Sequence, residues 1–392
     1  LMGKGARLMA AMLAVLKAGK FFILLDSSFP KARNVALLED SQAGLVIGDR
    51  ENASLARDMI TNPGRLLEFD SIDLSISPDN LDLYLVPKAF ATILYTSGST
   101  GEPKGIICDH RDLLHRIMLR TIESQACEHD RIALLPTGTA NAVTNSFFAL
   151  LNGAMLCPFA IQKEGVIRLA KWLSEERITI CPFSSSLFRS FTAVLTGEET
   201  FPDLRIIRLR SETVHKSDFE IFKKLFPSHC VFVTGLATSE TGQLTTYALN
   251  NNIDFSGDGV PIGYPVQDKE ILLLDDAGNE IAGNQVGEIV VRSRYLAVGY
   301  WRRPELTATK FKADPNGSGQ RLCFTGDTGV RLPDGCLVHK GRKDFRVKIR
   351  GYGVELAEVE QSLLAHSAVK QAVVLARQND SSNARLVAYY TG

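Results

Sequence analysis

Five short apolar runs, rich in β-branched and aromatic residues, alternate with longer stretches of helical spacing through the middle of this chain. The runs occupy residues 131–135, 154–158, 178–183, 204–209 and 230–234. Ahead of the first run, Leu113, Ile117 and Met118 recur at the three-to-four spacing of one helix face. Alternation of this kind predicts an α/β fold in which sheets are flanked by helices.

The composition is that of an ordinary globular protein. The chain has 392 residues, 45% of them apolar and 22% charged, which is enough for more than one domain. Because 44 basic residues balance 44 acidic ones, the charge favours neither a nucleic-acid surface nor a membrane surface. The seven cysteines are scattered and form no C-x-x-C pair. We therefore expect reduced, mostly buried thiols in a cytoplasmic protein.

A loop rich in serine, threonine and glycine lies between two strand-like segments, residues 90–95 and 106–108. Glycines let a backbone approach anionic oxygens closely, hydroxyls donate hydrogen bonds, and a lysine supplies charge. The groups suited to phosphate are Thr96, Ser97, Gly98, Ser99, Thr100, Gly101 and Lys104. Lys104 follows a proline and precedes Gly105 and another apolar run, so this is not a Walker-type loop that opens a helix. The alternative is a flexible surface turn.

At this point the chain resembles a known superfamily. Residues 95–105, with the sequence YTSGSTGEPKG, are similar to the signature of the adenylate-forming enzymes: acyl-CoA synthetases, luciferases and the adenylation domains of nonribosomal peptide synthetases. Residues 16–33, 287–307, 324–327 and 341–351 resemble further segments of that superfamily, in the expected order. The resemblance covers nearly the whole chain and is greatest to the peptide synthetase branch.

The resemblance implies a division into two domains. Residues 1–343 would form the large AMP-binding core domain, and residues 344–392 a partial α+β C-terminal domain, with Asp344 at the hinge. It also implies that the large domain lacks its beginning, and that a later loop with the family's catalytic lysine would follow Gly392.

The resemblance further implies the use of ATP and Mg²⁺. Thr96, Lys104 and Glu240 would be the catalytic residues, and the loop of residues 96–104 would hold the β- and γ-phosphates. Glu240 would also bind Mg²⁺, with Ser239 near the α-phosphate. Asp327 would accept the ribose hydroxyls, and Arg342 would reach the ribose or phosphate side. Outside this motif order, Glu240 would be interpreted as a solvated loop carboxylate, and either Asp327 or Arg342 as one partner in some surface ion pair.

Two departures from the family pattern concern the ligands. Leu236 replaces the tyrosine that packs on adenine, so aromatic stacking is lost there. Ala140 stands where an aspartate pairs with the substrate's α-ammonium in the amino-acid-activating branch. An alanine cannot pair with an ammonium, and an unpaired buried charge costs on the order of several kcal/mol. We therefore hypothesise an acid without an α-ammonium: a keto, hydroxy, aryl or acyl acid. The alternatives are an alignment slip or another ammonium partner, such as Glu212.

The same alignment predicts a substrate pocket of mixed lining without a fixed charge, suited to a neutral side chain of medium size. Its members would be Ala140, Asn141, Thr144, Leu209, Ser211, Gly235, Gln243 and Leu244. Each of them could equally be a packing residue.

The predicted function is activation of a carboxylic acid as an acyl-adenylate, with release of pyrophosphate. The acyl group would then pass to the phosphopantetheine thiol of a peptidyl or acyl carrier protein, in the same polypeptide. Three alternatives remain open: an ordinary amino-acid-activating domain, a stand-alone acyl- or aryl-CoA ligase, and a catalytically weak nucleotide-binding remnant. We expect neither nucleic acid nor membrane among the partners.

Overall fold

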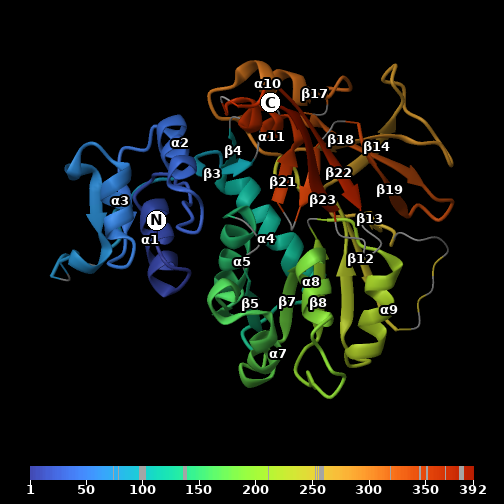
Figure 1. The fold of residues 1–392 in the computed structure, drawn as a ribbon, viewed down its shortest axis with the longest axis horizontal. Helices are drawn as coiled ribbons and strands as arrows, with labels where there is room; N and C mark the ends of the chain where they lie inside the picture. The colour runs from blue at the N-terminus through green and yellow to red at the C-terminus, as the bar shows by residue number, and fades with distance from the viewer. Residues whose placement is uncertain are drawn as a thin grey trace.

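The computed structural model confirms the predicted α/β class (Figure 1). It describes the chain except for residues 74, 78, 97–102, 136–138, 211, 252, 254, 256–259, 318, 344–345, 350–351, 367 and 379–383. In Figure 1 the N-terminal helices lie at one side, the central sheet with its helices lies below, and the later antiparallel strands lie above.

All five predicted apolar runs form strands of one seven-stranded sheet, in the order β13-β12-β9-β8-β7-β5-β6. Its parallel part consists of β5 (Arg131–Leu134), β6 (Met155–Pro158), β7 (Ile180–Ser184), β8 (Ile206–Arg210) and β9 (Val231–Thr234). The antiparallel edge consists of β12 (Thr245–Leu249) and β13 (Tyr264–Pro265). Parallel strands require crossover helices, which explains the alternation in the sequence.

Helices cover both faces of this sheet. On one face α4 (His110–Ser124) and α5 (Thr139–Leu151) bury Ile117 and Phe147 against the strands. On the other, α7 (Val166–Glu175), α8 (Ser185–Thr192) and α9 (Lys216–Leu225) bury a second cluster that includes Phe188 and Phe222. A short helix, α6 (Ile161–Glu164), precedes α7. Successive strand residues therefore contact different sets of helices, and this alternation decides which side chains can reach the site.

Two further sheets of the molecule are antiparallel. One contains β3 (Phe90–Thr96), β4 (Lys104–Asp109) and β16 (Gly299–Tyr300). The other contains β14 (Glu270–Leu274), β15 (Gly287–Ser293), β17 (Phe311–Ala313), β18 (Arg321–Arg331) and β19 (Leu337–Arg342), with α10 (Pro304–Lys310) preceding β17. A small hairpin of β10 (Ala237–Thr238) and β11 (Gly242–Gln243) lies between β9 and β12. Ile106 of β4 packs in the same apolar cluster as Ile289 of β15, which joins the two sheets.

The N-terminal segment forms a small group of helices, and Met9 and Met12 of its first helix pack in the same apolar cluster as Ile117 of α4. It contains α1 (Ala6–Lys17), α2 (Lys31–Ser41) and α3 (Ala53–Met59), with two short 3₁₀ turns, η1 (Pro63–Arg65) and η2 (Phe69–Ser71). A parallel pair, β1 (Val46–Gly48) and β2 (Leu66–Glu68), completes it. None of the helices in the described part of the chain is both long enough and apolar enough to cross a membrane.

The C-terminal segment is built from strands and one helix in its described part. It contains β20 (Arg346–Ile349), β21 (Tyr352–Glu355), α11 (Leu356–Leu364), β22 (Gln371–Gln378) and β23 (Ala384–Thr391). The short strand β21 is not evident in the sequence pattern; it pairs with β20 as a hairpin. The proposed hinge residue, Asp344, lies outside the described residues.

The cysteines are all free thiols, as expected. Six of the seven are buried, and Cys127 is exposed in the connection between α4 and β5.

Candidate active site

The two strands that flank the predicted phosphate loop form as expected. β3 and β4 pair antiparallel, and Thr96 lies directly opposite Lys104 across the ladder. Thr96 and Lys104 therefore lie together at one end of the strand pair. Five predicted phosphate-binding residues lie outside the described part of the chain, namely Ser97, Gly98, Ser99, Thr100 and Gly101.

Gly105 has a packing role within β4 rather than a role in the turn. A Cβ at this position would lie 2.8 Å from Cγ2 of Ile93 and 3.2 Å from Cβ of Trp301. The N–H of Trp301 donates to the carbonyl of Gly105 at 2.7 Å. A glycine next to Lys104 thus lets the segment that follows β16 approach the strand closely.

Glu240 lies in the turn between β10 and β11 and is tied to the sheet that carries Lys104. The hydroxyl of Tyr300 donates to Oε1 of Glu240 at 2.8 Å. The backbone N–H of Ala297 donates to the backbone carbonyl of Glu240 at 2.9 Å. Tyr300 in turn pairs with Ile106, two residues beyond Lys104. The structure therefore holds Glu240 and Lys104 on one framework.

Arg116, a residue that the sequence interpretation missed, supports the same turn. Its Nη2 donates to the carbonyl of Ser239 at 2.9 Å, and it forms an ion pair of 2.8 Å with Asp112, one helical turn earlier. Burial disfavours the charged guanidinium, but the Asp112 carboxylate outweighs this and raises the pKa of Arg116. The i, i+4 spacing of an acid and a base was visible in the sequence; its target on the distant hairpin was not.

Asp327 and Arg342 are brought together as a pair. They lie opposite one another on β18 and β19, and Nη1 of Arg342 donates to Oδ2 of Asp327 at 2.9 Å. Nε2 of His339 lies 3.0 Å from the other carboxylate oxygen, Oδ1. Asp327 is only 4% exposed, so these two partners fix its orientation from both sides. No motif in the sequence had indicated His339.

Three predicted pocket residues, Ala140, Asn141 and Thr144, lie on the first turns of α5. The hydroxyl of Thr144 donates to the carbonyl of Ala140 at 2.9 Å, which turns it back onto its own helix. Asn141 instead contacts α4, where its Oδ1 accepts from Nη2 of Arg120 at 3.4 Å.

Three further predicted pocket residues lie beyond the end of β9. Gly235 follows β9, and a Cβ there would meet the carbonyl oxygen of Thr245 at 2.2 Å. Leu244 is fully buried in the cluster that also holds Leu236, the residue at the position of the adenine-packing tyrosine. Gln243 points to α4 and donates to Oε1 of Glu123 at 2.6 Å.

The prediction for β8 is wrong. Leu209 packs in the cluster with Phe183 and Phe188, on the face covered by α7, α8 and α9 rather than by α5. Because strand residues alternate between faces, its neighbours Arg208 and Arg210 face α4 and α5 instead. The Arg208 guanidinium lies 5.6 Å from the ring centroid of Phe148 on α5. The arginines of β8, rather than Leu209, thus lie on the sheet face covered by the helix that carries Ala140 and Asn141. Ser211 lies outside the described residues.

Comparison with known proteins agrees with this arrangement. The AMP-binding enzyme family matches residues 1–301. The chain belongs to this family. Among curated proteins it is 31% identical to tyrocidine synthase 1 of Brevibacillus parabrevis, over 100% of this chain and 35% of that protein. It is 33% identical to surfactin synthase subunit 2 of Bacillus subtilis (strain 168), over 97% of this chain and 10% of that protein. The chain thus spans about a third or less of these relatives.

Solved structures show the same fold as this AMP-binding domain. An artificially fused adenylation–PCP di-domain NRPS from Klebsiella oxytoca superposes with a TM-score of 0.86 at 23% identity, covering 99% of this chain and 77% of that one. The o-succinylbenzoate CoA synthetase of Bacillus subtilis gives a TM-score of 0.81 at 20% identity, covering 100% and 77%. The predicted family, its peptide synthetase relatives and the enzyme class are confirmed.

Glu212, the alternative partner for an ammonium, has other contacts in this AMP-binding domain. It accepts hydrogen bonds from the backbone N–H and the hydroxyl of Ser186, at 2.6 and 3.1 Å, in the first turn of α8. Its carboxylate thus accepts hydrogen bonds at the start of α8, where backbone N–H groups have no partner within the helix.

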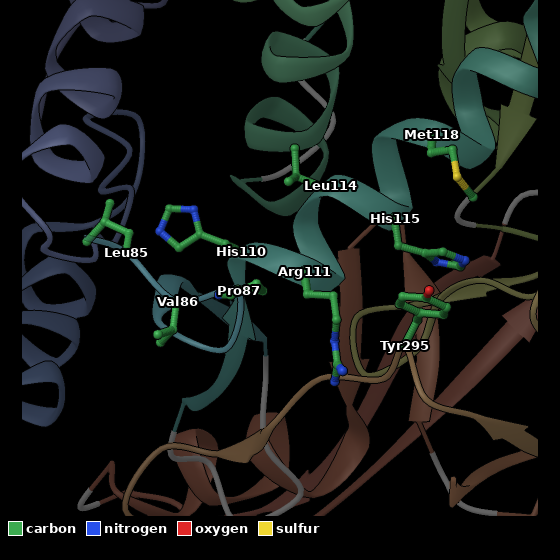
Figure 2. Close-up of a pocket in the computed structure, with 9 residues that line it drawn as sticks. All are labelled: Leu85, Val86, Pro87, His110, Arg111, Leu114, His115, Met118 and Tyr295. Carbon is green, nitrogen blue, oxygen red and sulfur yellow. The ribbon is translucent and has the colours of Figure 1, made fainter. Parts of the chain in front are cut away.

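A separate cavity of about 500 Å³ lies beside the first half of α4, and Figure 2 shows the rings of His115 and Tyr295 face to face at one side of it. The ring centroids are 4.0 Å apart and the planes differ by 2°. Its lining is mostly apolar and contains none of the predicted site residues; it consists of Leu85, Val86, Pro87, His110, Arg111, Leu114, His115, Met118 and Tyr295.

Proposed function

We propose that this AMP-binding domain uses ATP and Mg²⁺ to convert a carboxylic acid into an acyl-adenylate, with release of pyrophosphate. The observation that carries the proposal is the link from Glu240 through Tyr300 to β4, the strand that begins with Lys104. Adenylation brings two anions together and expels a third, so it requires fixed positive charge and a cation at one place. A loop ending in a lysine, with a carboxylate tethered to the same sheet, meets that requirement.

Glu240 fits a magnesium ligand. Mg²⁺ prefers oxygen donors and commonly takes one or two protein carboxylates, completing its shell with phosphate oxygens and water. The Tyr300 hydroxyl and the Arg116-supported turn hold Glu240 in place. Thr96 and Lys104 would hold the β- and γ-phosphates, together with the predicted loop residues, and Ser239 would lie near the α-phosphate.

Asp327 fits the ribose of the nucleotide. A carboxylate accepts hydrogen bonds from both hydroxyls of a diol, and this one is fixed in orientation by Arg342 and His339. The guanidinium of Arg342 donates to this carboxylate, and a carboxylate has about four lone-pair sites with which it can accept hydrogen bonds.

The acid would lack an α-ammonium group. Ala140 offers no carboxylate at the start of α5, and Glu212, the other candidate, is engaged with α8. The peptide synthetase relatives support the acceptor of the second step, which would be the phosphopantetheine thiol of a carrier protein.

A pyrophosphate-exchange panel tests the first step. We expect exchange with keto or hydroxy acids to exceed exchange with the amino acid of the same side chain. Glu240→Gln should lower exchange with every acid by about a hundredfold, because it removes the metal's carboxylate. A clear preference for the amino acid would overturn the substrate assignment, and exchange that survives Glu240→Gln would overturn the metal assignment.

A second assay tests the acceptor. The activated acid is offered to a holo-carrier protein and, separately, to coenzyme A. We expect the thioester on the carrier protein; a product formed only with coenzyme A would identify a stand-alone ligase instead. ATP binding with no exchange for any acid would identify a nucleotide-binding remnant.

A further inference from the structure

Three arginines and one glutamate form a cluster between α4 and β8. Glu123 forms ion pairs with both arginines of β8: Nε of Arg208 lies 2.8 Å from Oε2, and Arg210 contacts Oε1. Burial alone would raise the pKa of Glu123, but Arg210 and Arg208 lower it to about 2, so it is ionised. The third arginine, Arg120, lies one turn before Glu123 on α4. Within this cluster, three positive charges face one negative charge.

The surplus charge is buried. Arg208 is 2% exposed and Arg210 is 8% exposed. Burial, followed by repulsion from Arg208 and Arg210, holds the pKa of Arg120 well below its usual range. Charges removed from water require partners, and like charges held together require an opposite charge more strongly still. The interior thus contains a positive region that Glu123 only partly neutralises.

Some guanidinium N–H groups of this cluster also lack acceptors. Within the part of the chain that the structure describes, the buried Nη1 of Arg208 and Nε of Arg210 have no hydrogen-bond partner. A buried donor without an acceptor is costly, and two on adjacent inward-facing positions are rare in a purely structural network.

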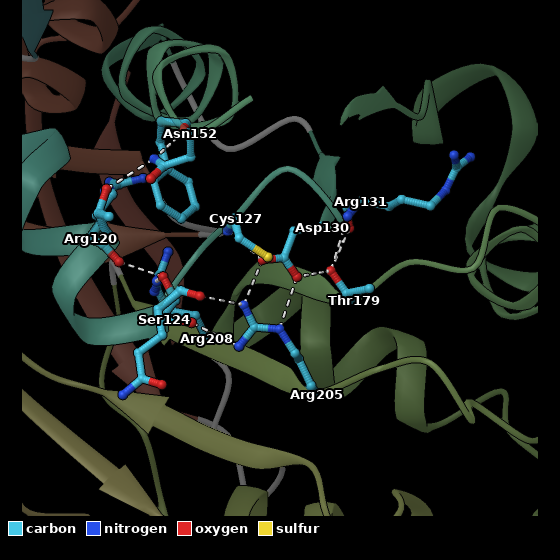
Figure 3. Close-up of polar contacts among 12 residues, drawn as sticks. Arg120, Ser124, Cys127, Asp130, Arg131, Asn152, Thr179, Arg205 and Arg208 are labelled. Atoms are coloured by element: carbon cyan, nitrogen blue, oxygen red, sulfur yellow. Dashed lines mark hydrogen bonds and ion pairs between the residues drawn. The ribbon is translucent and has the colours of Figure 1, made fainter. Parts of the chain in front are cut away.

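Arg208 is nevertheless firmly positioned, as Figure 3 shows. Its Nη2 lies 3.3 Å from the hydroxyl of Ser124, at the end of α4. Arg205, the residue just before β8, donates to the Ser124 carbonyl at 2.7 Å and forms an ion pair of 2.7 Å with Asp130. The end of α4 and the start of β8 are thus fixed to each other, so the guanidinium groups are held in place before any ligand binds.

The cluster borders the predicted acid pocket at two points. Arg120 contacts Asn141 at 3.4 Å and also Asn145, both on α5. From the opposite side, Gln243 donates to Glu123 at 2.6 Å. Asn141 and Gln243 are both predicted pocket residues, so an acid bound there would lie next to the guanidinium groups.

We propose that the acid activated by this domain carries a second anionic group, a second carboxylate, which binds the buried cluster of Arg120, Arg208 and Arg210. The inference rests on the proposed function and specifies its substrate class. One carboxylate would react at the α-phosphate of ATP. The second would accept hydrogen bonds from the free guanidinium N–H groups and neutralise the surplus positive charge of the cluster. Ala140 is consistent with this, because a substrate without an ammonium needs no acid at that position.

The test compares acids that differ only in the distal group. Pyrophosphate exchange is measured with glutarate, its monoamide and pentanoate, and with 2-oxoglutarate and 2-oxopentanoate. We expect the dicarboxylates to exceed their neutral counterparts in kcat/KM by at least about tenfold, the size of one charge-assisted hydrogen bond. Equal or better exchange with the neutral acids would overturn the inference and leave the proposed function intact. Exchange with none of these five acids would overturn the inference, and exchange with no acid of the wider panel described above would overturn the proposed function as well.

Variants separate binding from structural support. Arg208→Gln and Arg210→Gln should abolish the preference for the dicarboxylate over its monoamide, whereas a structural role would lower exchange with both acids equally. Arg177→Gln is the matched control, because that arginine pairs with Asp203 at the surface and should keep the preference.

Binding without turnover gives an independent readout. Glutarate should raise the Tm of the wild-type protein more than its monoamide does, and Arg210→Gln should remove the difference. Where a variant fails to fold, the wild-type comparison still decides; an equal shift with both ligands would contradict the inference.

Discussion

Arg116 shows how one buried side chain can serve both stability and the site. It neutralises Asp112 within α4 and reaches across to the carbonyl of Ser239. The turn that carries Glu240 is thus fixed by a residue that belongs to no recognised motif.

A pair of variants separates these two roles. Arg116→Met leaves the buried Asp112 without its ion-pair partner and should lower the free energy of unfolding by about 3 kcal/mol. Asp112→Leu combined with Arg116→Met removes both charges and should recover most of that loss. The double variant should still show reduced pyrophosphate exchange, because the Ser239 carbonyl has lost its donor. Chemical denaturation and exchange assays on the same samples measure the two effects; full recovery of exchange would show that Arg116 acts through stability alone.

His115 predicts a dependence of stability on pH. Its side chain is 3% exposed, and burial, followed by the charge of Lys269, lowers the pKa of His115 to about 4, although Asp268 and Asp112 oppose this. In the unfolded chain this histidine binds a proton near pH 6.5, whereas in the folded chain it binds one only near pH 4. The free energy of unfolding should therefore fall as pH drops from about 6.5 to about 4, by up to about 3 kcal/mol.

Urea denaturation at about pH 7.5 and about pH 5 measures this loss. His115→Phe keeps the ring that stacks on Tyr295 and should reduce the loss. His129→Phe changes an exposed histidine and should behave as the wild type does. An equal loss in all three proteins would rule out His115 as the source.

At the scale of elements, Gly263 fixes the approach of β13 to β12. Its φ is +81°, and a Cβ there would meet the carbonyl oxygen of Thr246 at 2.1 Å. Gly278 has a similar φ of +86° but lies in an exposed turn where a Cβ would meet nothing within 4 Å. The two glycines thus share their backbone conformation and differ in the space around them.

This difference makes them a matched pair. Gly263→Ala should destabilise the protein by about 3 kcal/mol, through strain and a backbone clash. Gly278→Ala should cost about 1 kcal/mol, through conformational strain alone. Denaturant unfolding of both variants tests the expectation; equal losses would mean that the edge strand moves aside without cost.

Some strands and site residues could be predicted from the sequence, and others could not. The five strands of the parallel part were predictable because their apolar runs are continuous. Asp327 and Arg342 were each identified by a motif, but their ion pair with each other was not predicted. The error at β8 arose because alternation identifies two faces but does not indicate which helices cover them. Leu209 was assigned to the pocket, yet the packing of Phe183 and Phe188 places it on the far face. His339 and Arg116 act over contacts that no local pattern encodes.

For the whole molecule, buried side chains are distributed unevenly. Every residue of β7 and β8 is buried, whereas Val374 is the one buried hydrophobic residue among the described side chains beyond residue 343. Opening the C-terminal segment exposes little apolar surface, so it should cost far less free energy than opening the central sheet.

Hydrogen exchange measured by mass spectrometry tests this expectation. Amides of β22 and β23 should exchange well before those of β7 and β8 in the intact protein. A fully unfolded sample supplies the reference for intrinsic rates. Equal protection of the two regions would show that the molecule opens as a single cooperative unit.

The distribution of thiols has a practical consequence. Cys127 is exposed, while burial shields the other six and raises the pKa of thiols such as Cys108 and Cys323. A maleimide dye should therefore attach to the native protein at one position, between α4 and β5, without removal of any other cysteine. The wild-type chain is thus ready for immobilisation or single-molecule fluorescence through a natural handle.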